Sequence, residues 1–365
     1  MKRPVAVAFY PHHVEHLAPL CAMLEAPLVV CDSPGQVAAV ESYPAIDAVL
    51  VRDFRMPEGI GRVLDVLRKL DADVILYSEL IARTTLRAYF RTWPAKPRIV
   101  HCPHGFSEKM QLWSRDIAFQ DIALMLGRHA LDQLRATGAA APECTLIVAG
   151  NLRRAWFREQ CAHFEQQRRA WGVADDARRT ILYAPTWDDR IGSSSFFAAF
   201  TTLVDGLPAD SRLVVKLHPH LEQNASAVSE VLARCAGRDD VAVLRNCPLV
   251  YPFLEAADVY IGDMSAMAYD FLGYDRPMFF LNQTANTARD PMFAYLFRCG
   301  TTIDPAQYAD VYGIVQRALD TDRARYSAER AKLDAYTHAP ALSRQDLRAA
   351  LERATAGAAP AWLGG

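Results

Sequence analysis

Residues 241–281 read VAVLRNCPLVYPFLEAADVYIGDMSAMAYDFLGYDRPMFFL. Three short apolar runs in this stretch, Val241–Leu244, Val259–Gly262 and Met278–Leu281, have the composition of buried strands, and helix-forming sequence separates them. Strands that alternate with helices pair in parallel, because the chain must cross the sheet between them. The stretch therefore predicts a parallel sheet covered by helices on both faces.

The same alternation runs through most of the chain. It predicts further strands at Val5–Phe9, Leu28–Val30, Ala48–Val51, Val74–Tyr77, Arg98–His101, Ile122–Leu126, Thr145–Ala149, Thr180–Ala184 and Leu213–Lys216. A polar, helix-prone stretch, Asn151–Gly172, interrupts this rhythm. We therefore expect an α/β protein with two doubly wound parallel-sheet domains that face a cleft. The predicted boundaries are 1–155 for the first domain, 156–178 for a helical linker, 179–335 for the second domain, and 336–365 for C-terminal helices and a tail.

Composition excludes several classes of protein. The 365 residues carry a formal net charge of -2, which provides no global attraction for nucleic acid. Eight scattered cysteines form no pair at zinc spacing, and we interpret them as reduced thiols of a cytoplasmic protein. No apolar run reaches the roughly 20 residues that cross a bilayer. We expect neither a cofactor nor a metal.

His104 is the first candidate for chemistry. The strand Arg98–His101 leads into Cys102-Pro103-His104-Gly105, so the imidazole follows a strand, where ligands of parallel sheets bind. A neutral imidazole could remove a proton from an attacking hydroxyl, and Gly105 would allow close approach of a substrate. The alternative is a loop histidine that makes only local hydrogen bonds.

A second candidate is the pair Lys216 and His218 at the end of Leu213–Lys216. The two residues are two positions apart, so they are predicted to lie on one face of the strand, and Pro219 restricts the backbone of His218. These donors could stabilise the negative charge of a diphosphate. A buried histidine satisfied by the backbone remains the alternative.

A third candidate lies where Val259–Gly262 meets the next helix. Asp263 or Ser265 is predicted to cap that helix, and the amide groups at the helix start, including that of Ala266, could bind an anion. Asp263 would repel a diphosphate unless it binds a ribose hydroxyl or orients a cationic neighbour. Simple capping is the alternative.

The loop after Thr180–Ala184 contains Thr186, Trp187 and the acidic pair Asp188-Asp189. Two adjacent carboxylates can ligate a metal, but no third ligand accompanies them. We therefore interpret the acidic pair as solvated and not as a metal site.

Together these motifs resemble the CDP-glycerol glycerophosphotransferase family of teichoic-acid primases and polymerases. The resemblance rests on Pro103-His104-Gly105, Leu182–Trp187, Lys216–Pro219, Asp263–Ala266 with Asp270, and Asp275–Met278. It implies a GT-B fold, an acceptor-side first domain and a nucleotide-donor-binding second domain. It further implies that His104 activates the acceptor hydroxyl and that His218 binds the donor diphosphate.

The resemblance also implies roles for the remaining residues. Donor binding would involve Lys216, Thr186, Asp263, Ser265 and Ala266, and the substrate loops would contain Gly105, Asn151 and Asp189.

Two departures from the family pattern bear on the donor. Met264-Ser265-Ala266 has one serine where the family has two, and Asp188-Asp189 stands where it has Arg-Asp. These changes leave open CDP-ribitol or a nucleotide sugar as the donor. A GT-B glycosyltransferase and a non-catalytic nucleotide-binding protein are the competing interpretations.

A basic segment suggests a further partner. Leu80–Arg98 places Arg83, Arg87 and Arg91 four residues apart, hence on one helix face, with Lys96 and Arg98 beyond. Such a helix could attach to an anionic membrane, where lipid-linked acceptors reside. A surface helix with its apolar side in the core is the alternative.

Overall fold

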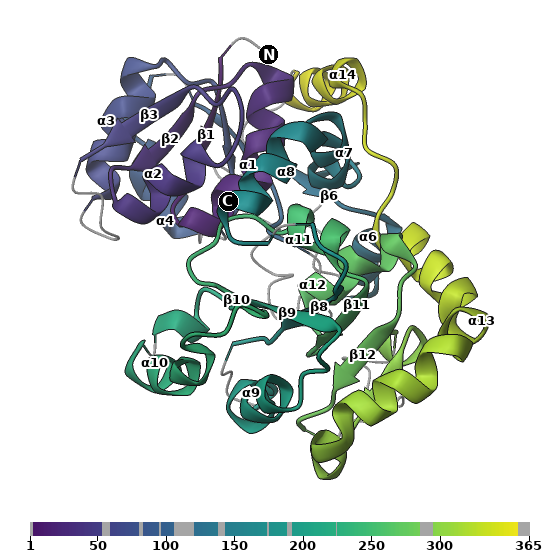
Figure 1. Ribbon diagram of the computed structural model, residues 1–365. Helices are drawn as coiled ribbons and strands as arrows, with labels where there is room; N and C mark the ends of the chain where they lie inside the picture. Colours follow the sequence, from purple (N-terminus) through teal and green to yellow (C-terminus); the bar gives the residue numbers. More distant parts are fainter. Residues whose placement is uncertain are drawn as a thin grey trace. The chain divides into compact units, whose positions relative to one another are not determined.

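The computed structural model describes residues 3–52, 59–79, 83–94, 96–105, 120–137, 143–173, 175–187, 192–223, 225–284 and 295–356. The chain divides into two compact units (Figure 1). The first unit comprises residues 1–160 and 336–365, and the second comprises residues 161–335. Each contains one parallel sheet, as the alternating sequence pattern predicts.

The first unit contains a seven-stranded sheet in the order β3-β2-β1-β4-β5-β6-β7, and every described pairing is parallel. The strands are β1 (Pro4–Val7), β2 (Leu28–Cys31), β3 (Ala48–Val51), β4 (Val74–Tyr77), β5 (Arg98–His101), β6 (Ile122–Met125) and β7 (Thr145–Val148). The helices are α1 (Pro11–Leu24), α2 (Pro34–Glu41), α3 (Ile60–Lys69), α4 (Arg83–Phe90), α6 (Arg128–Thr137), α7 (Leu152–Glu159) and α14 (Arg344–Thr355). Each predicted strand of this half is therefore confirmed; β3, β4 and β5 have the predicted bounds, and the ends of the others shift by at most two residues.

The C-terminal segment packs on the carboxyl ends of β6 and β7. The amide of Ala339 donates to the carbonyl of Leu126, and the amide of Leu342 donates to that of Ala149. Gly150 permits this approach, because its φ is +78° and a Cβ would lie 2.2 Å from the carbonyl oxygen of Pro340. The chain therefore returns after the second unit to complete the first.

The second unit contains a six-stranded parallel sheet in the order β10-β9-β8-β11-β12-β13. The strands are β8 (Arg179–Ala184), β9 (Ser211–Lys216), β10 (Val241–Leu244), β11 (Val259–Gly262), β12 (Met278–Leu281) and β13 (Thr301–Ile303). The α-helices are α8 (Cys161–Ala170), α9 (Phe196–Asp205), α10 (Ala225–Leu232), α11 (Tyr251–Ala256), α12 (Ala266–Phe271) and most of α13 (Val311–Thr337). Short 3₁₀ turns occur at Leu221–Gln223, Ala233–Cys235, Leu272–Tyr274, Leu296–Arg298 and Pro305–Asp310.

The basic segment is shorter than the sequence predicts. Helix α4 ends at Phe90, and Arg98 begins β5, where its guanidinium lies 3.3 Å from the Asp121 carboxylate. Lys96 lies beyond the helix end, and its Nζ donates to the carbonyl oxygens of Phe90 and Arg91 at 3.3 and 3.0 Å. The prediction that Lys96 and Arg98 extend the basic helix is therefore wrong, because one cation caps the helix and the other belongs to a strand.

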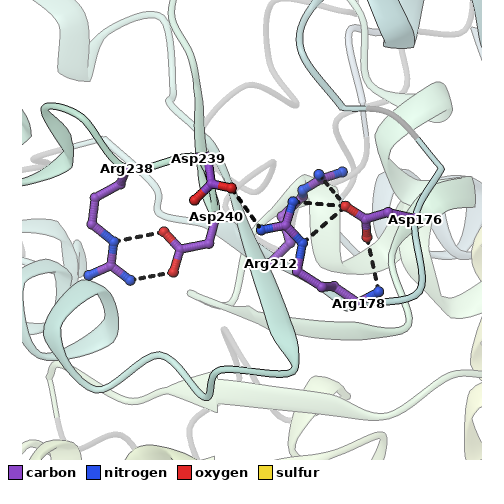
Figure 2. Close-up of polar contacts among 6 residues, drawn as sticks. All are labelled: Asp176, Arg178, Arg212, Arg238, Asp239 and Asp240. Atoms are coloured by element: carbon purple, nitrogen blue, oxygen red, sulfur yellow. Dashed lines mark hydrogen bonds and ion pairs between the residues drawn. The ribbon is translucent and has the colours of Figure 1, made fainter.

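Ion pairs stabilise the amino-terminal edge of the second sheet (Figure 2). Asp176 accepts hydrogen bonds from Arg178, the nearest at 2.8 Å, and also pairs with Arg212. Arg238 forms a bidentate pair with Asp240, with distances of 2.7 and 2.6 Å. These side chains lie where β8, β9 and β10 begin, so the charged contacts lie at the edge opposite the candidate site.

Candidate functional site

In each unit the first strand lies inside the sheet. Strand β1 has β2 on one side and β4 on the other, and β8 lies between β9 and β11. The chain therefore leaves the first strand in one direction and later returns to its other side. Loops at the carboxyl ends of such neighbours separate and leave room for a ligand. Thr186 follows β8, and His218 and Asp263 follow its two neighbours, β9 and β11. His104 follows β5, which lies beyond β4 in the first sheet.

In the second unit, Asp263 joins two of these loops. Its side chain is buried, and the carboxylate accepts hydrogen bonds from the backbone amide of Thr186 at 2.7 Å and from that of Ser195 at 3.2 Å. Asp263 follows β11, whereas Thr186 and Ser195 lie between β8 and α9. The carboxylate therefore fixes the loop after β8, a role that the sequence does not reveal.

Thr186 and Lys216 are also held inside the second unit. The carbonyl oxygen of buried Thr186 accepts a hydrogen bond from the Ser194 hydroxyl at 2.9 Å. Nζ of Lys216, likewise buried, donates to the carbonyl oxygen of Cys247 at 2.8 Å. Lys216 thus connects the end of β9 to the loop after β10, which leaves its positive charge at the carboxyl edge of the sheet.

The backbone determines the proton position on His218. The amide of His220 donates a hydrogen bond to Nδ1 of His218 at 3.1 Å. A ring nitrogen that accepts a hydrogen bond carries a lone pair, so the proton of this neutral imidazole is on Nε2. His218, which is half-buried, therefore has an N–H donor at Nε2, as the binding of an anionic oxygen requires.

Ser265 is the N-cap of α12, with φ -142° and ψ 174°. Its side chain makes no capping hydrogen bond, and Ala266 is the first helical residue. The cap predicted at Asp263 or Ser265 is therefore at Ser265, since Asp263 is used in the loop contacts. The start of α12 lies directly after β11, next to the loop that Asp263 fixes.

In the first unit, the backbone sets the opposite tautomer on His104. Its Nδ1 lies 2.9 Å from the carbonyl oxygen of Ser78. A carbonyl oxygen only accepts, so Nδ1 carries the proton and Nε2 carries the lone pair. His104 is half-buried and is followed by Gly105, whose φ of +111° favours glycine. The ring therefore has a basic nitrogen at Nε2.

Sequence reasoning misses a cluster of histidines around His104. His12, His13 and His16 lie in the first turns of α1, and their ring centroids are 6.0, 5.5 and 6.2 Å from that of His104. The sequence signal is Tyr10-Pro11-His12-His13, which follows β1 just as His104 follows β5. We define these four histidines with His101 as the histidine cluster.

Burial keeps part of the histidine cluster neutral. His13 is fully buried, and burial, followed by the charges of His12 and His104, lowers its pKa from 6.5 to about 2. Burial and the charge of His104 lower the pKa of His101 to about 3. Both imidazoles are therefore uncharged at neutral pH, so His104 has two buried neutral rings beside it.

The remaining predicted residues divide among the first unit, the second unit and the part of the chain outside the described residues. Asn151 caps α7 in the first unit, where its Oδ1 accepts from the amide of Arg154 at 3.0 Å. Asp189 lies outside the described residues, as does the side chain of Arg83. His104 and Gly105 belong to the first unit, whereas Thr186, Lys216, His218, Asp263, Ser265 and Ala266 belong to the second.

In the described part of the chain, no group of three or more His, Cys, Asp or Glu side chains has metal-binding geometry. No described helix combines the length and the apolar character that crossing a bilayer requires.

Residues 155–296, which include most of the second unit, match the family model for CDP-Glycerol:Poly(glycerophosphate) glycerophosphotransferase. This segment belongs to that family. The match confirms the glycerophosphotransferase family that the motifs indicate. The predicted class of enzyme, a transferase, is therefore also confirmed. It includes the loops of Thr186, His218 and Asp263 but not that of His104. A search of curated proteins gives no significant match.

Solved structures show the same fold. The wall teichoic acid polymerase TagF is 13% identical over 97% of this chain and 88% of its own, with a TM-score of 0.68. MnaA of S. aureus in complex with UDP is 14% identical over 96% of both chains, with a TM-score of 0.62. The UDP-GlcNAc 2-epimerase of Neisseria meningitidis is 12% identical over 96% of this chain and 100% of its own, also with a TM-score of 0.62. The predicted GT-B fold is confirmed.

We predict that Asp263→Asn destabilises the glycerophosphotransferase-family segment and weakens nucleotide binding. The amide –NH₂ would face backbone N–H donors, which costs about 1–3 kcal/mol. Thermal unfolding and calorimetric titration with CMP measure both effects. The matched control is Asp258→Asn, because Asp258 accepts from the amide of Thr180 at the other end of β8. The control should lose stability and keep its CMP affinity; unchanged CMP affinity in Asp263→Asn would contradict the role assigned to Asp263.

We also predict that acid destabilises the first unit through the histidine cluster. His13 and His101 have folded-state pKa values of about 2 and 3, below the usual 6.5, so the unfolded chain binds more protons once the pH falls below 6.5. The free energy of unfolding is therefore highest above pH 6.5. It declines as the pH falls, by up to about 2 kcal/mol per histidine at pH 5. Urea unfolding at pH 7.5 and 5.0 tests this.

The variant His101→Gln removes one of the titrating rings. Its stability should depend less steeply on pH than that of the parent chain, whatever its absolute stability. His163→Gln, in the second unit, is the control and should keep the parent slope. An equal slope in all three proteins would show that the cluster does not govern acid stability.

Proposed function

We propose that the protein transfers a glycerophosphate or related polyol-phosphate group from a CDP-activated donor to a hydroxyl of a cell-surface glycan or lipid-linked acceptor. The observation that carries the proposal is the family match over residues 155–296, which includes the donor-side loops. The solved structure of a TagF variant soaked with CDPG has the same fold. The opposite tautomers of His104 and His218 support it, because the reaction needs one base and one hydrogen-bond donor.

On the donor side, the second unit would bind the diphosphate. His218 donates from Nε2 to a diphosphate oxygen, and the amides at the start of α12 with the Ser265 hydroxyl provide further donors. Lys216 supplies positive charge, while Asp263 and Thr186 hold the loop. The departure at Ala266 removes one hydroxyl from this group of donors, which leaves the choice between a glycerol and a ribitol head group open.

On the acceptor side, Nε2 of His104 takes the proton of the acceptor hydroxyl. The hydroxyl oxygen forms a bond to the outer phosphorus of the donor, and the bond from that phosphorus to CMP breaks, with the electron pair leaving on CMP. Such phosphoryl transfer depends mainly on positioning and on stabilisation of charge. The Ser78 carbonyl contributes by keeping the proton of His104 on Nδ1 before the transfer.

The products separate this proposal from the competing ones. Glycerophosphate transfer releases CMP, whereas a glycosyltransferase that breaks the bond at the sugar carbon releases a nucleoside diphosphate. Chromatography of nucleotides after incubation with CDP-glycerol and with common nucleotide sugars therefore identifies the reaction. Binding of nucleotide without any turnover would instead support the non-catalytic alternative.

We predict different faults when each histidine is replaced by glutamine, which keeps an N–H donor but has no basic nitrogen. His104→Gln should lower turnover by about 10²–10⁴-fold and leave CMP affinity near that of the parent chain. His218→Gln should retain part of its activity, while His218→Ala should lose both CMP affinity and turnover. Steady-state kinetics beside calorimetric titration with CMP measure these effects. Full turnover in His104→Gln would refute its role as the base.

We also propose that the protein works at the cytoplasmic face of the membrane, with Arg83, Arg87 and Arg91 near anionic lipid. In support, Arg91 is exposed, although Phe90 is part of the core. The chain should sediment with anionic vesicles at low salt and not with neutral ones. Replacing these three arginines with glutamine should weaken attachment to the vesicles. The control variant, Arg317→Gln with Arg323→Gln on α13, should attach like the parent chain. Equal recovery of the protein on anionic and neutral vesicles would argue against attachment.

A further inference from the structure

Tyr10 is an exposed aromatic side chain at the edge of the histidine cluster. It is the N-cap residue of α1, and 44% of its surface is exposed to solvent. Its ring stacks on that of His12, with centroids 5.6 Å apart and planes 10° from parallel. One ring face of Tyr10 is thus supported by an imidazole, and the phenol ring forms the outer end of a stack.

The stack leads from solvent to the proposed base. The His12 ring lies edge-on to that of His104, with centroids 6.0 Å apart. His13 lies beneath both aromatic groups, 5.2 Å from Tyr10 and 4.5 Å from His12, and is fully buried. Buried His13 therefore supports a continuous row of rings from Tyr10 through His12 to His104.

Glu79 lies beside this row, with its Oε2 4.0 Å from Nε2 of His13. Arg153, which is buried near His16, pairs with the buried carboxylate of Glu15 at 3.6 Å. His13 and His101 are neutral, as their lowered pKa values show. A flat, supported aromatic ring near the Glu79 carboxylate suits the apolar C–H face of an uncharged sugar ring better than it suits a phosphate, because the carboxylate would repel the phosphate.

We propose that Tyr10 and His12 form an acceptor subsite in which the terminal sugar ring of a glycan packs on Tyr10 and directs a hydroxyl to Nε2 of His104. This inference rests on the proposed function and specifies the acceptor as a sugar, not as a glycerol phosphate. Tyr10 and His12 lie outside residues 155–296, so the family match says nothing about this subsite.

Binding without donor tests the subsite separately from the reaction. Saturation-transfer NMR on the full chain would use methyl glycosides of glucose, galactose, N-acetylglucosamine and N-acetylmannosamine, with glycerol 3-phosphate as the phosphate probe. At least one glycoside should bind, with its C–H protons receiving the saturation, and glycerol 3-phosphate should not compete. Absence of binding by all four glycosides, or displacement by glycerol 3-phosphate, overturns the sugar subsite.

Variants locate the binding. Tyr10→Leu keeps apolar bulk without a flat ring and should weaken the bound glycoside about tenfold, while Tyr10→Phe should bind it like the parent chain. The control is Leu50→Ala on β3, which removes another exposed apolar side chain, 51% exposed, from the same unit. Equal affinity in Tyr10→Leu and the parent chain overturns the proposal.

Kinetics distinguishes failure of the subsite from failure of the function. With CDP-glycerol as donor, Tyr10→Leu should raise the KM for the glycoside about tenfold while the KM for the donor stays unchanged. If the parent chain and Tyr10→Leu both release CMP and have the same KM for the acceptor, the subsite is overturned and the proposed function stands. Absence of CMP release from the parent chain with every acceptor refutes the proposed function, and the NMR result then still decides whether Tyr10 binds a sugar.

Discussion

The constraint on which both halves of the structure depend is the internal position of the first strand of each sheet. Strand β8 pairs with β9 and β11 on its two sides, and β1 pairs with β2 and β4. Loops that follow adjacent parallel strands must lie at one edge, so residues distant in sequence become neighbours. Asp263 and Thr186, 77 residues apart, share a hydrogen bond for this reason. The chemistry of the site is thus a consequence of strand order.

Backbone groups then determine what each histidine can do. A carbonyl faces Nδ1 of His104 and an amide faces Nδ1 of His218, so the two rings have opposite tautomers. Side-chain identity alone would make these residues equivalent. Their different roles arise because the loop after β5 places its histidine against Ser78, the first residue after β4, whereas the loop after β9 turns back on its own histidine.

The sequence predicts the sheets well because strands buried on both faces are continuous apolar runs, such as Val74–Tyr77. It does not predict β13, since Thr301–Ile303 is three residues long and becomes a strand only by pairing with β12. Motifs identify His104 and His218 as candidates. The loop contacts of Asp263 depend on tertiary neighbours, so no local pattern could reveal them. For the histidine cluster, the sequence shows only that His12 and His13 follow a strand, and their approach to His104 depends on the pairing of distant strands.

The cost of the histidine cluster is itself evidence about function. Both ring nitrogens of His13 are buried, and within the described part of the chain neither has a hydrogen-bond partner. A buried polar group without a partner costs about 1–3 kcal/mol, and an apolar residue of similar size would avoid that cost. Groups of this kind concentrate where the structure serves a ligand and not stability alone. His13 is one of several buried polar residues of this kind, and it lies beneath Tyr10, His12 and His104, where it supports the proposed acceptor subsite. The family match covers residues 155–296 only, so this energetic argument supports the proposed subsite independently of that match.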